Sequence, residues 1–384
     1  MGLGKTIWAN PVEYLRKADA EAPVLFFAPQ VLQATARRFL RGFPGLVTYA
    51  VKANPDEEVI ANLAAAGITA FDVASPEEIA LVRRLVPDAA LHYNNPVRSR
   101  REVAMAAAFD VASYSVDARS ELAKLFDAVP QGREIAVRFK LPVAGAIYDF
   151  GAKFGAEPAL AADLLRDVAE AGYTPALTFH PGTQCTDPQA WVAYIRSAAD
   201  IAQAARVRIA RLNVGGGFPS HRRVGEVPAL EVIFSAIAAE TAAAFGADAP
   251  ALVCEPGRGL VAEAFSLAAS VKAVRDGRDV FLNDGVYGAL AELPLLGPID
   301  RVAVIAPDGR LRQGAPVERV VFGPTCDSVD RLPGEMRLPA DIAEGDHVLI
   351  QGMGAYSAVT STRFNGFGGL AVATVLLLEP SPAP

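Results

Sequence analysis

Between residues 29 and 260 the chain alternates between short apolar runs and longer stretches with helical spacing, and this alternation restricts the fold more than any other feature. A helix must return the chain between two parallel strands, so repeated strand–helix units predict a parallel sheet. Eight such units within about 230 residues predict a closed (β/α)8 barrel of the TIM type. We expect its strands at 46–51, 69–74, 89–93, 110–114, 134–139, 176–180, 209–214 and 251–255.

The stretches between the predicted strands carry helix-start signals, because several begin with proline or with an acidic first turn. We expect helices at 57–66, 76–86, 119–128, 158–171, 188–205 and 229–245. A helix at 29–42 precedes the first strand, and nothing helical follows 251–255. The sequence therefore predicts that 29–42 supplies the eighth outer helix of the barrel.

After about residue 265 the pattern changes to short strands, with turn signals at Asp276-Gly277 and Asp308-Gly309. We expect these strands at 266–274, 279–283, 301–306, 317–322, 346–351 and 370–378. The sequence predicts an antiparallel β-sandwich or β-barrel domain that the N-terminal residues complete. The expected division is a barrel over 28–262 and a β domain over 1–27 and 263–384.

Charge and composition argue against several classes of protein. The net charge is −7 and no run of Lys or Arg occurs, so nucleic acid and anionic membranes are not expected partners. We find no apolar stretch of the roughly 18 to 20 residues that span a bilayer, and no pattern of a secretory signal. The three cysteines cannot all pair, so we expect reduced thiols and a cytoplasmic protein.

Neither end of the sequence is predicted to carry a site. Gly2-Leu3-Gly4-Lys5-Thr6 is similar to part of a phosphate-binding loop, but it lacks the glycine that this motif needs five positions before its Gly-Lys pair. The motif also needs a preceding strand. We expect the last residues, 379–384, to fray.

Polar residues and glycines follow several of the predicted strands, and the carboxyl ends of barrel strands are where catalytic groups gather. A barrel would bring eight of them to one mouth: Lys52, Asp72, Arg138, His180, Gly215, Gly216, Gly217 and Glu255. A lysine in a poorly solvated site has a lowered pKa, and its neutral amine is a nucleophile toward an aldehyde. Taken alone, Lys52 is equally well explained as a lysine whose ammonium group reaches solvent from a strand end.

The other strand ends favour a site for a planar, phosphorylated cofactor. Three successive glycines let the backbone approach a ligand, and their N–H groups can hold a phosphate, although a flexible turn has the same composition. Glu255 could keep a pyridine nitrogen protonated, so that the ring accepts electrons, or it could pair with Arg258. His180 could stack on a planar ring or could be a core histidine.

The segment around Lys52, Tyr49-Ala50-Val51-Lys52-Ala53-Asn54-Pro55, resembles the lysine motif of the fold-type III decarboxylases that use pyridoxal 5'-phosphate (PLP). This family includes ornithine, lysine, arginine and diaminopimelate decarboxylases. Further motifs match in the same order over nearly the whole chain: 71–75 (FDVAS), 180–184 (HPGTQ), 215–219 (GGGFP), 255–258 (EPGR), 284–288 (DGVYG), 323–328 (GPTCDS) and 354–356 (GAY). The resemblance implies a (β/α)8 barrel with a β domain, and a head-to-tail homodimer with active sites at the subunit interface.

The resemblance also implies roles around the cofactor. Lys52 would carry PLP as a Schiff base, His180 would stack on the ring, and Glu255 would pair with the pyridine nitrogen. Asp72 would lie near the Schiff base and Arg138 near the ring hydroxyl. The remaining cofactor contacts, chiefly to the phosphate, would come from Thr183, Gly215, Gly216, Gly217, Gly257, Arg258 and Tyr356. No metal is implied.

On the substrate side, the resemblance implies that Cys326 donates a proton to the α-carbon and that Asp327 binds a distal amine. Both residues would reach in from the neighbouring subunit. Further substrate contacts would come from Tyr287, Glu292 and Phe364. Glu292 would stand in for an acidic residue that eukaryotic ornithine decarboxylases carry nine positions beyond the tyrosine, where this chain has Leu296.

The segments Cys326-Asp327 and 363–367 (RFNGF) are most similar to ornithine decarboxylases, which implies conversion of L-ornithine to putrescine and CO2, a step of polyamine biosynthesis. Lysine and meso-diaminopimelate remain alternative substrates. A racemase would reuse the barrel but would reprotonate its substrate, commonly from a tyrosine. A non-catalytic regulator typically lacks cofactor contacts such as Lys52 and Glu255, which this chain retains.

Overall fold

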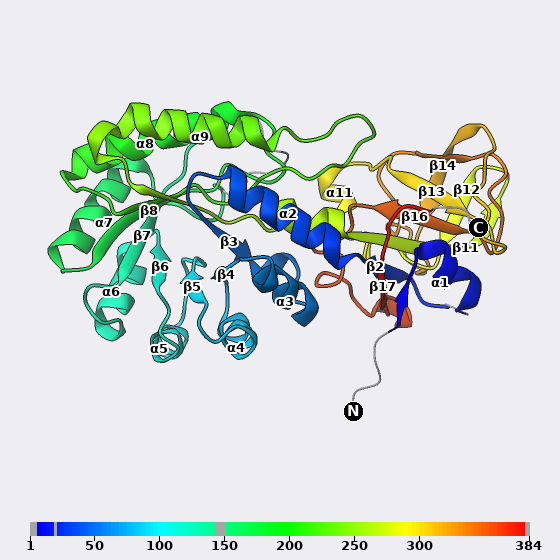
Figure 1. The fold of residues 1–384 in the computed structure, drawn as a ribbon, viewed down its shortest axis with the longest axis horizontal. Coiled ribbons are helices and arrows are strands. Elements are labelled where there is room, and N and C mark those ends of the chain that lie inside the picture. The colour runs from blue at the N-terminus through cyan, green and yellow to red at the C-terminus, as the bar shows by residue number, and fades with distance from the viewer. Residues whose placement is uncertain (1–5, 19–20, 143–146, 148–150, 381–384) are drawn as a thin grey trace. The chain divides into compact units, whose positions relative to one another are not determined.

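The computed structural model describes residues 6–18, 21–142, 147 and 151–380 (Figure 1). The chain divides into a barrel unit, residues 35–219 and 228–259, and a β unit, residues 1–34, 220–227 and 260–384. The Gly4-Lys5 pair and the last four residues lie outside the described part of the chain.

The barrel unit is built on eight parallel strands that form a closed ring, as the sequence predicts. In chain order they are β3 (Leu46–Ala50), β4 (Ala70–Val73), β5 (Ala90–Tyr93), β6 (Ser113–Val116), β7 (Glu134–Arg138), β8 (Thr174–Thr178), β9 (Arg211–Asn213) and β10 (Ala251–Cys254). The ring closes where β10 pairs with β3, with Val253 opposite Leu46. Strand β6 begins three residues later than we predicted, because Asp110 adopts a positive φ of 56° and prolongs the preceding turn.

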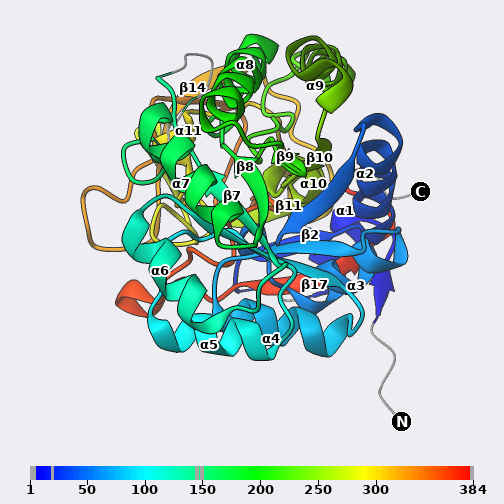
Figure 2. The same cartoon turned by 90° about the vertical axis from the view of Figure 1, so that its left-hand side faces the viewer.

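Helices surround the strands on the outside of the barrel (Figure 2). They are α3 (Glu57–Ala65), α4 (Pro76–Leu85), α5 (Arg100–Ala108), α6 (Arg119–Ala128), α7 (Pro158–Glu170), α8 (Pro188–Ala205) and α9 (Leu230–Phe245). Proline occupies the first turn of α4, α7 and α8, where its missing N–H costs nothing. The Ser99 side chain caps α5 in a reciprocal pair with Glu102. The proline signals account for the close agreement between the predicted and observed starts of α4, α7 and α8, whereas α5 was not among the predicted helices.

Helix α2 (Pro29–Gly42) supplies the eighth outer helix through its second half. The Phe39 ring lies edge-on to Phe218 and Phe234, with ring centroids 5.5 and 5.3 Å away. Arg38 makes two hydrogen bonds of 2.6 Å to the Glu231 carboxylate on α9. The prediction for 29–42 is therefore confirmed by contacts within the barrel unit.

Helix α9 corrects our statement that the chain has no apolar stretch of membrane-spanning length. Residues 230–248 are long and apolar enough to cross a membrane by length and composition alone. In the structure the helix lies against the barrel, with Ile233, Phe234 and Ile237 buried. Its Glu240 pairs with Arg196 of α8 at 2.8 Å. The alanine-rich sequence imitates a membrane span because alanine is tolerated on both faces of an outer helix.

The β unit contains a mixed nine-stranded sheet. Its strands are β1 (Ile7–Trp8), β2 (Val24–Phe27), β11 (Phe265–Arg275), β12 (Asp279–Leu282), β13 (Val302–Ile305), β14 (Pro316–Phe322), β15 (Met336–Pro339), β16 (His347–Gln351) and β17 (Ala371–Val375). The unit also contains the short helices α1 (Pro11–Lys17) and α11 (Leu293–Leu296). The chain passes from the barrel unit to the β unit within α10 (Arg258–Val261). Five strand pairs are antiparallel, as expected, but β1–β17, β17–β2 and β12–β14 are parallel. Strands β2 and β17 come from opposite ends of the chain, so no hairpin fixes their relative direction. The missed strand β15 is only four residues long.

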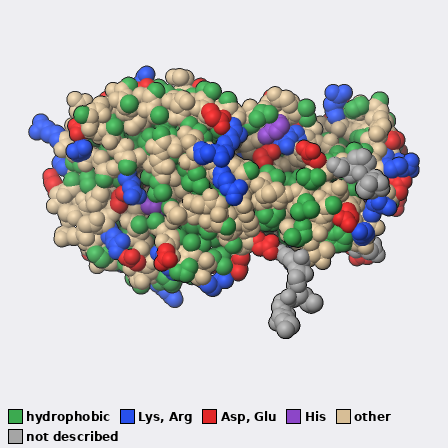
Figure 3. Space-filling model, viewed as in Figure 1, with side chains coloured by type: hydrophobic (Ala, Val, Ile, Leu, Met, Phe, Trp, Pro, Cys, Tyr) green, Lys and Arg blue, Asp and Glu red, His purple; other side chains and the backbone are tan. Residues whose placement is uncertain are grey.

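Charged side chains of both signs are interspersed on the face shown in Figure 3. Ion pairs also join neighbouring outer helices of the barrel unit, such as Arg84–Glu57 at 2.8 Å and Arg119–Asp163 at 3.1 Å. Exposed pairs of this kind contribute at most about 1 kcal/mol each. The barrel is therefore stabilised mainly by its buried apolar side chains.

The buried histidine of β5 predicts how stability depends on pH. The His92 ring is 3% exposed, its Nδ1 lies 2.6 Å from Ser113 Oγ, and burial lowers its pKa to about 4. The unfolded chain binds this proton near pH 6.5, so the contribution of neutral His92 is complete above that pH and is lost as pH falls toward 4. We expect the free energy of unfolding to fall by up to roughly 3 kcal/mol over that window from this residue alone.

Urea unfolding at pH 7.5 and pH 5 measures this effect. His92→Gln cannot titrate, so its free energy of unfolding should depend less steeply on pH than that of the unmodified protein. Equal pH dependence in the two proteins would show that His92 is not the titrating group.

Candidate active site

Lys52 lies just beyond strand β3, in a single 3₁₀ turn over Val51–Ala53. The Tyr49 hydroxyl donates a hydrogen bond of 2.8 Å to the Asn54 carbonyl and so holds this turn. The Lys52 Nζ atom lies 3.9 Å from Asp72 Oδ2 at the end of β4. The lysine side chain is 49% exposed, which is more than we predicted, whereas Asp72 is 3% exposed. The sequence thus identified two groups that meet at one barrel mouth.

Glu255 follows β10 and is buried beside two asparagines. The Asn94 amide donates to its Oε1 at 2.5 Å, and the Asn213 amide donates to the same oxygen. Burial, helped by the nearby negative charge of Asp72, raises the pKa of Glu255 to about 8. Burial also raises the pKa of Asp72, against the opposing charge of Lys52. Two carboxyl groups in one dry site each favour the protonated form, and a cationic ligand would favour their ionisation.

Arg138 supplies a fixed positive charge at the end of β7. Its guanidinium lies 5.2 Å from the Phe154 ring centroid. Burial lowers the pKa of Arg138, and the charges of Glu255, Asp117 and Asp72 oppose that shift. An arginine remains charged even when its pKa is lowered, so Arg138 stabilises nearby anionic groups.

His180, which follows β8, is a neutral ring. Its Nδ1 accepts a hydrogen bond of 3.0 Å from the Gly182 N–H, which places the ring hydrogen on Nε2. Burial lowers the pKa of His180 well below its usual value, and the charges of Arg138 and Lys52 lower it further. A neutral imidazole with one edge fixed by the backbone is suited to stacking on a planar ligand.

The three glycines after β9 form a close-fitting backbone turn. Gly215 and Gly217 have positive φ values of 69° and 81°. A Cβ atom on Gly216 would lie 2.7 Å from the Glu255 carbonyl oxygen, and one on Gly217 would lie 2.1 Å from that of Gly182. Only glycine fits these positions. The Gly215 N–H already donates to Asn213 Oδ1 at 2.9 Å, so the other two glycines are the better candidates to meet a phosphate.

The residues after β10 add a second glycine turn and an arginine to the barrel mouth. A Cβ atom on Gly257 would lie 2.9 Å from the Ala53 Cβ, so the absence of a side chain lets this turn close against the turn that carries Lys52. Arg258 is buried and begins α10. Thr183 is half-buried in the loop after β8.

The donor set of the barrel mouth fits PLP. A carboxylate is available for a ring nitrogen, a flat neutral imidazole for the ring face, and an amine for the carbonyl carbon. A glycine turn with a buried arginine suits a phosphate.

The predicted substrate residues form a second group, which lies in the β unit. The Tyr287 hydroxyl donates a hydrogen bond of 2.6 Å to Asp327 Oδ2, and this bond lowers the pKa of Asp327. The Val329 N–H meets Asp327 Oδ1 at 3.1 Å. The Phe364 ring centroid lies 4.8 Å from that of Tyr287. The loops carrying Asp327, Tyr287 and Phe364 are therefore brought together as the motifs predict.

Cys326 is exposed, and its backbone N–H and its thiol both donate to the same side-chain oxygen. That oxygen is Asn365 Oδ1, which lies 3.1 Å from the Cys326 nitrogen and 3.2 Å from Sγ. Buried Asp330 holds the same loop, because its carboxylate accepts the N–H groups of Thr325 and Val286 at 3.0 and 2.9 Å. A fixed thiol on an ordered loop suits a proton donor.

The remaining predicted residues also belong to the β unit. Glu292 directly precedes α11, and its carbonyl accepts the N–H of Leu296 at 2.9 Å, while the Leu296 side chain is buried. Tyr356 adopts a positive φ of 62° and accepts two hydrogen bonds from Thr360 at its carbonyl.

Sequence reasoning missed four polar residues of these two groups: Asn94, Asn213, Asp330 and Asn365. Asn94 and Asn213 each stand at the end of a barrel strand, which is the signal that identified Lys52 and Glu255. Asparagine is common in the turns that follow strands, so its presence there is a weak signal. Asn365 lies within a motif that we used only for the substrate prediction.

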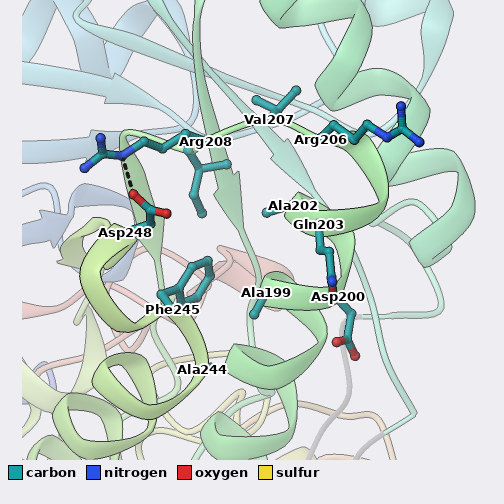
Figure 4. A pocket seen from close by; sticks show the side chains of 11 residues that line it. Ala199, Asp200, Ala202, Gln203, Arg206, Val207, Arg208, Ala244, Phe245 and Asp248 are labelled. Carbon is teal, nitrogen blue, oxygen red and sulfur yellow. Dashed lines mark ion pairs between the residues drawn. The ribbon is translucent and has the colours of Figure 1, made fainter.

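A separate pocket lies elsewhere on the barrel unit (Figure 4). It is lined by the ends of α8 and α9 and by the loop before β9: Ala199, Asp200, Ala202, Gln203, Arg206, Val207, Arg208, Ile209, Ala244, Phe245 and Asp248. Helices end and strands begin here, so the pocket is at the opposite end of the barrel from Lys52. Its Arg208 and Asp248 form an exposed ion pair at 3.4 Å. None of the predicted site residues lines it, so it is not the candidate active site.

Comparison with known proteins gives a consistent result. Residues 30–262 match the family model of the pyridoxal binding domain of pyridoxal-dependent decarboxylases. The chain is 31% identical to a lysine/ornithine decarboxylase of Selenomonas ruminantium, over 88% of this chain and 84% of the relative. It is 31% identical to the ornithine decarboxylase of Mus musculus, over 86% and 75%. The crystal structure of an arginine decarboxylase of Paramecium bursaria Chlorella virus, bound to agmatine, is similar with a TM-score of 0.82 and 25% identity, over 92% and 97%.

Proposed function

The chain belongs to the PLP-dependent decarboxylases of basic amino acids, of the ornithine, lysine and arginine type, and from that premise we propose that its own substrate is L-ornithine, which it converts to putrescine and CO2. Asp327 carries this proposal. Its carboxylate is held by the Tyr287 hydroxyl and the Val329 N–H, and the Tyr287 ring in turn packs against Phe364. A held carboxylate attracts the distal ammonium of a diamino acid. Relatives that act on ornithine are consistent with this choice.

The residues of the barrel mouth have distinct tasks in this reaction. Bound PLP supplies a protonated ring that accepts the electron pair left when the α-carboxylate departs as CO2. Lys52 would hold the cofactor's carbonyl carbon, with Asp72 beside its nitrogen. Glu255 would face the ring nitrogen, and His180 would cover one face of the ring. Gly216 and Gly217, with Arg258, would receive the phosphate.

The residues of the β unit complete the reaction. Cys326 would give its thiol proton to the α-carbon, so that the amine product forms with hydrogen in place of the carboxylate. Asn365 holds that thiol by accepting from its sulfur. Asp327 would fix the far end of the substrate, so that the α-carbon stays within reach of Cys326.

We also propose that the enzyme is a homodimer in which each active site combines one barrel unit with the partner's Cys326 and Asp327. In support, the sequence separates these residues from Lys52 by most of the chain, and they belong to the other unit. Mixing inactive Lys52→Ala with inactive Cys326→Ala subunits should restore about a quarter of the activity per site, because half of randomly formed dimers are mixed and each mixed dimer has one intact site.

The mixing experiment needs verified subunit exchange. Two preparations that each carry the same single variant serve as controls and should stay inactive. If mixed dimers are shown to form but remain inactive, each chain builds its own site.

The substrate proposal predicts the effect of Asp327→Ala. Removal of a charged hydrogen-bond partner should raise KM for ornithine by about ten- to a hundredfold and reduce the preference for ornithine over norvaline, which lacks the distal amine. Tyr287→Phe keeps the contact with Phe364 but loses the donor to Asp327, so its effect should be smaller. Glu344→Ala removes an exposed carboxylate of the same unit and is the matched control.

A substrate panel tests the proposal directly. Ornithine, lysine, arginine, meso-diaminopimelate and norvaline are offered to the PLP-loaded enzyme, and CO2 and amine products are followed. Lysine should be a slower substrate, because one methylene is worth only about 1–3 kcal/mol. If norvaline is decarboxylated as well as ornithine, the assignment of a diamine substrate is wrong. If meso-diaminopimelate is best, the distal carboxylate must find a cation near Asp327.

A further inference from the structure

Asn94 lies at the barrel mouth, immediately after β5. Its Nδ2 donates to Glu255 Oε1 at 2.5 Å, and its Oδ1 accepts a hydrogen bond of 2.8 Å from the Ser115 hydroxyl on β6. Ser115 is fully buried. A carboxylate only accepts hydrogen bonds, whereas a hydroxyl can donate, so these two partners fix which end of the amide is nitrogen.

The second buried carboxyl group of the mouth, Asp72, lies on β4, which pairs with β5. Its Oδ2 lies 3.9 Å from Lys52 Nζ. Asp72 therefore has a cation beside it, whereas Glu255 is held by the neutral amides of Asn94 and Asn213.

The hydrogen bonds of Glu255 involve only one of its two carboxylate oxygens among the described residues. Among the described residues, both amide donors, from Asn94 and Asn213, meet Oε1, and no hydrogen bond is made to Oε2. We propose that Asn94 is a positioning residue that fixes the Glu255 carboxyl group by its Oε1 and so leaves Oε2 available to the ring nitrogen of bound PLP.

Electrostatics explains why the site needs such a residue. Two buried carboxylates repel each other, and burial by itself drives both toward the neutral form. Lys52 and Arg138 stabilise both anions by charge, but each is a single cation that acts on two groups. Asn94 adds a hydrogen-bond donor to Glu255 without adding charge. A neutral Glu255 could not stabilise a proton on the ring nitrogen, so removal of Asn94 should change both the affinity for PLP and the absorption of the bound cofactor.

The test compares Asn94→Ala with Asn95→Ala. Asn95 is the next residue of the same loop, and its amide donates to the Ala74 carbonyl at 3.3 Å, whereas the side-chain hydrogen bonds to Glu255 from described residues come from Asn94 and Asn213. Both proteins are titrated with PLP without any amino acid, and the visible absorption of the bound cofactor is followed from pH 6 to 9. These readouts do not depend on which amino acid is the substrate. The inference about Asn94 can therefore fail while the proposed function holds, and the proposed function can fail while the inference holds.

For Asn94→Ala we expect PLP to bind about tenfold or more weakly and its visible absorption to become pH-dependent in this range, while Asn95→Ala behaves as the unmodified protein. Asn94→Asp, which has no donor and adds a third carboxylate, should bind PLP more weakly still. The titratable groups facing the pair are Lys52, Arg138, Glu78 and Cys254, and they are unchanged in every variant.

The inference is overturned if Asn94→Ala binds PLP with unchanged affinity and absorption, or if Asn95→Ala has the same effect. The second outcome would mean that the loop matters only for structure. Should the Asn94 variants fail to fold, Ser115→Ala decides the question. It removes only the bond that orients the amide, so PLP affinity must fall by a smaller factor in the same direction, and unchanged affinity rejects the proposal.

Discussion

Lys52→Ala is expected to abolish turnover and the visible absorption of the bound cofactor. Lys52 is the lysine that lies beside the buried Asp72 at the barrel mouth, and alanine there removes the amine that would join the cofactor's carbonyl carbon. The rate should fall by about 10³-fold or more, as is usual when a covalent catalytic group is removed. CO2 release and an absorption spectrum measure the two effects on one preparation.

Lys52→Arg is the matched control for this experiment. Lys52 also balances Asp72, which is buried at 3.9 Å, and its removal would leave that carboxyl group without its nearest cation. Arginine keeps the positive charge but is not a nucleophile at neutral pH. If the lysine acts covalently, both variants are inactive, although Lys52→Arg should retain more of the stability. Near-normal activity of Lys52→Ala without an added amine would refute the assignment.

The sequence was a sound guide to the barrel because its signals are local. Proline or an acidic residue in the first helical turn, and apolar runs between the helices, locate β7, α6 and α8 to within a residue. The same signals fail where structure depends on distant parts of the chain. The parallel pairing of β2 with β17 joins residues near the two ends of the chain, and no turn motif records it.

The active-site residues likewise fall into those that local sequence signals predict and those that depend on distant parts of the chain. Lys52 and Glu255 could be predicted because each ends an apolar strand within a motif. The pairing of Glu255 with Asn94 could not be predicted, because the two are 161 positions apart in the sequence and only closure of the barrel brings them together. Likewise, the Gly215 N–H was expected to face a ligand, but Asn213 uses it. Sequence motifs identify the groups that react, whereas the residues that hold them become visible only in three dimensions.

Glu255→Gln should reduce the rate far more than the affinity for PLP. Glutamine has the same shape, and its Oε1 can still accept from Asn94 and Asn213, so the hydrogen bonds that orient the side chain are kept. What is lost is the negative charge. A neutral amide cannot stabilise a proton on the ring nitrogen, and the ring then accepts the electron pair of the departing carboxylate poorly.

We expect kcat to fall by about 10²- to 10³-fold, the range found when one preorganised electrostatic group is removed, and PLP affinity to change by less than about tenfold. Glu255→Asp is the complementary variant, since it keeps the charge but withdraws the carboxylate by one methylene. The pKa of Glu255, about 8 in the protein alone, makes the comparison informative, because the carboxyl group gains its charge fully only when a cationic ring nitrogen faces it. A loss confined to PLP affinity would instead identify Glu255 as the structural partner of Arg258. A loss confined to kcat would show that the carboxylate acts on charge that develops during the reaction.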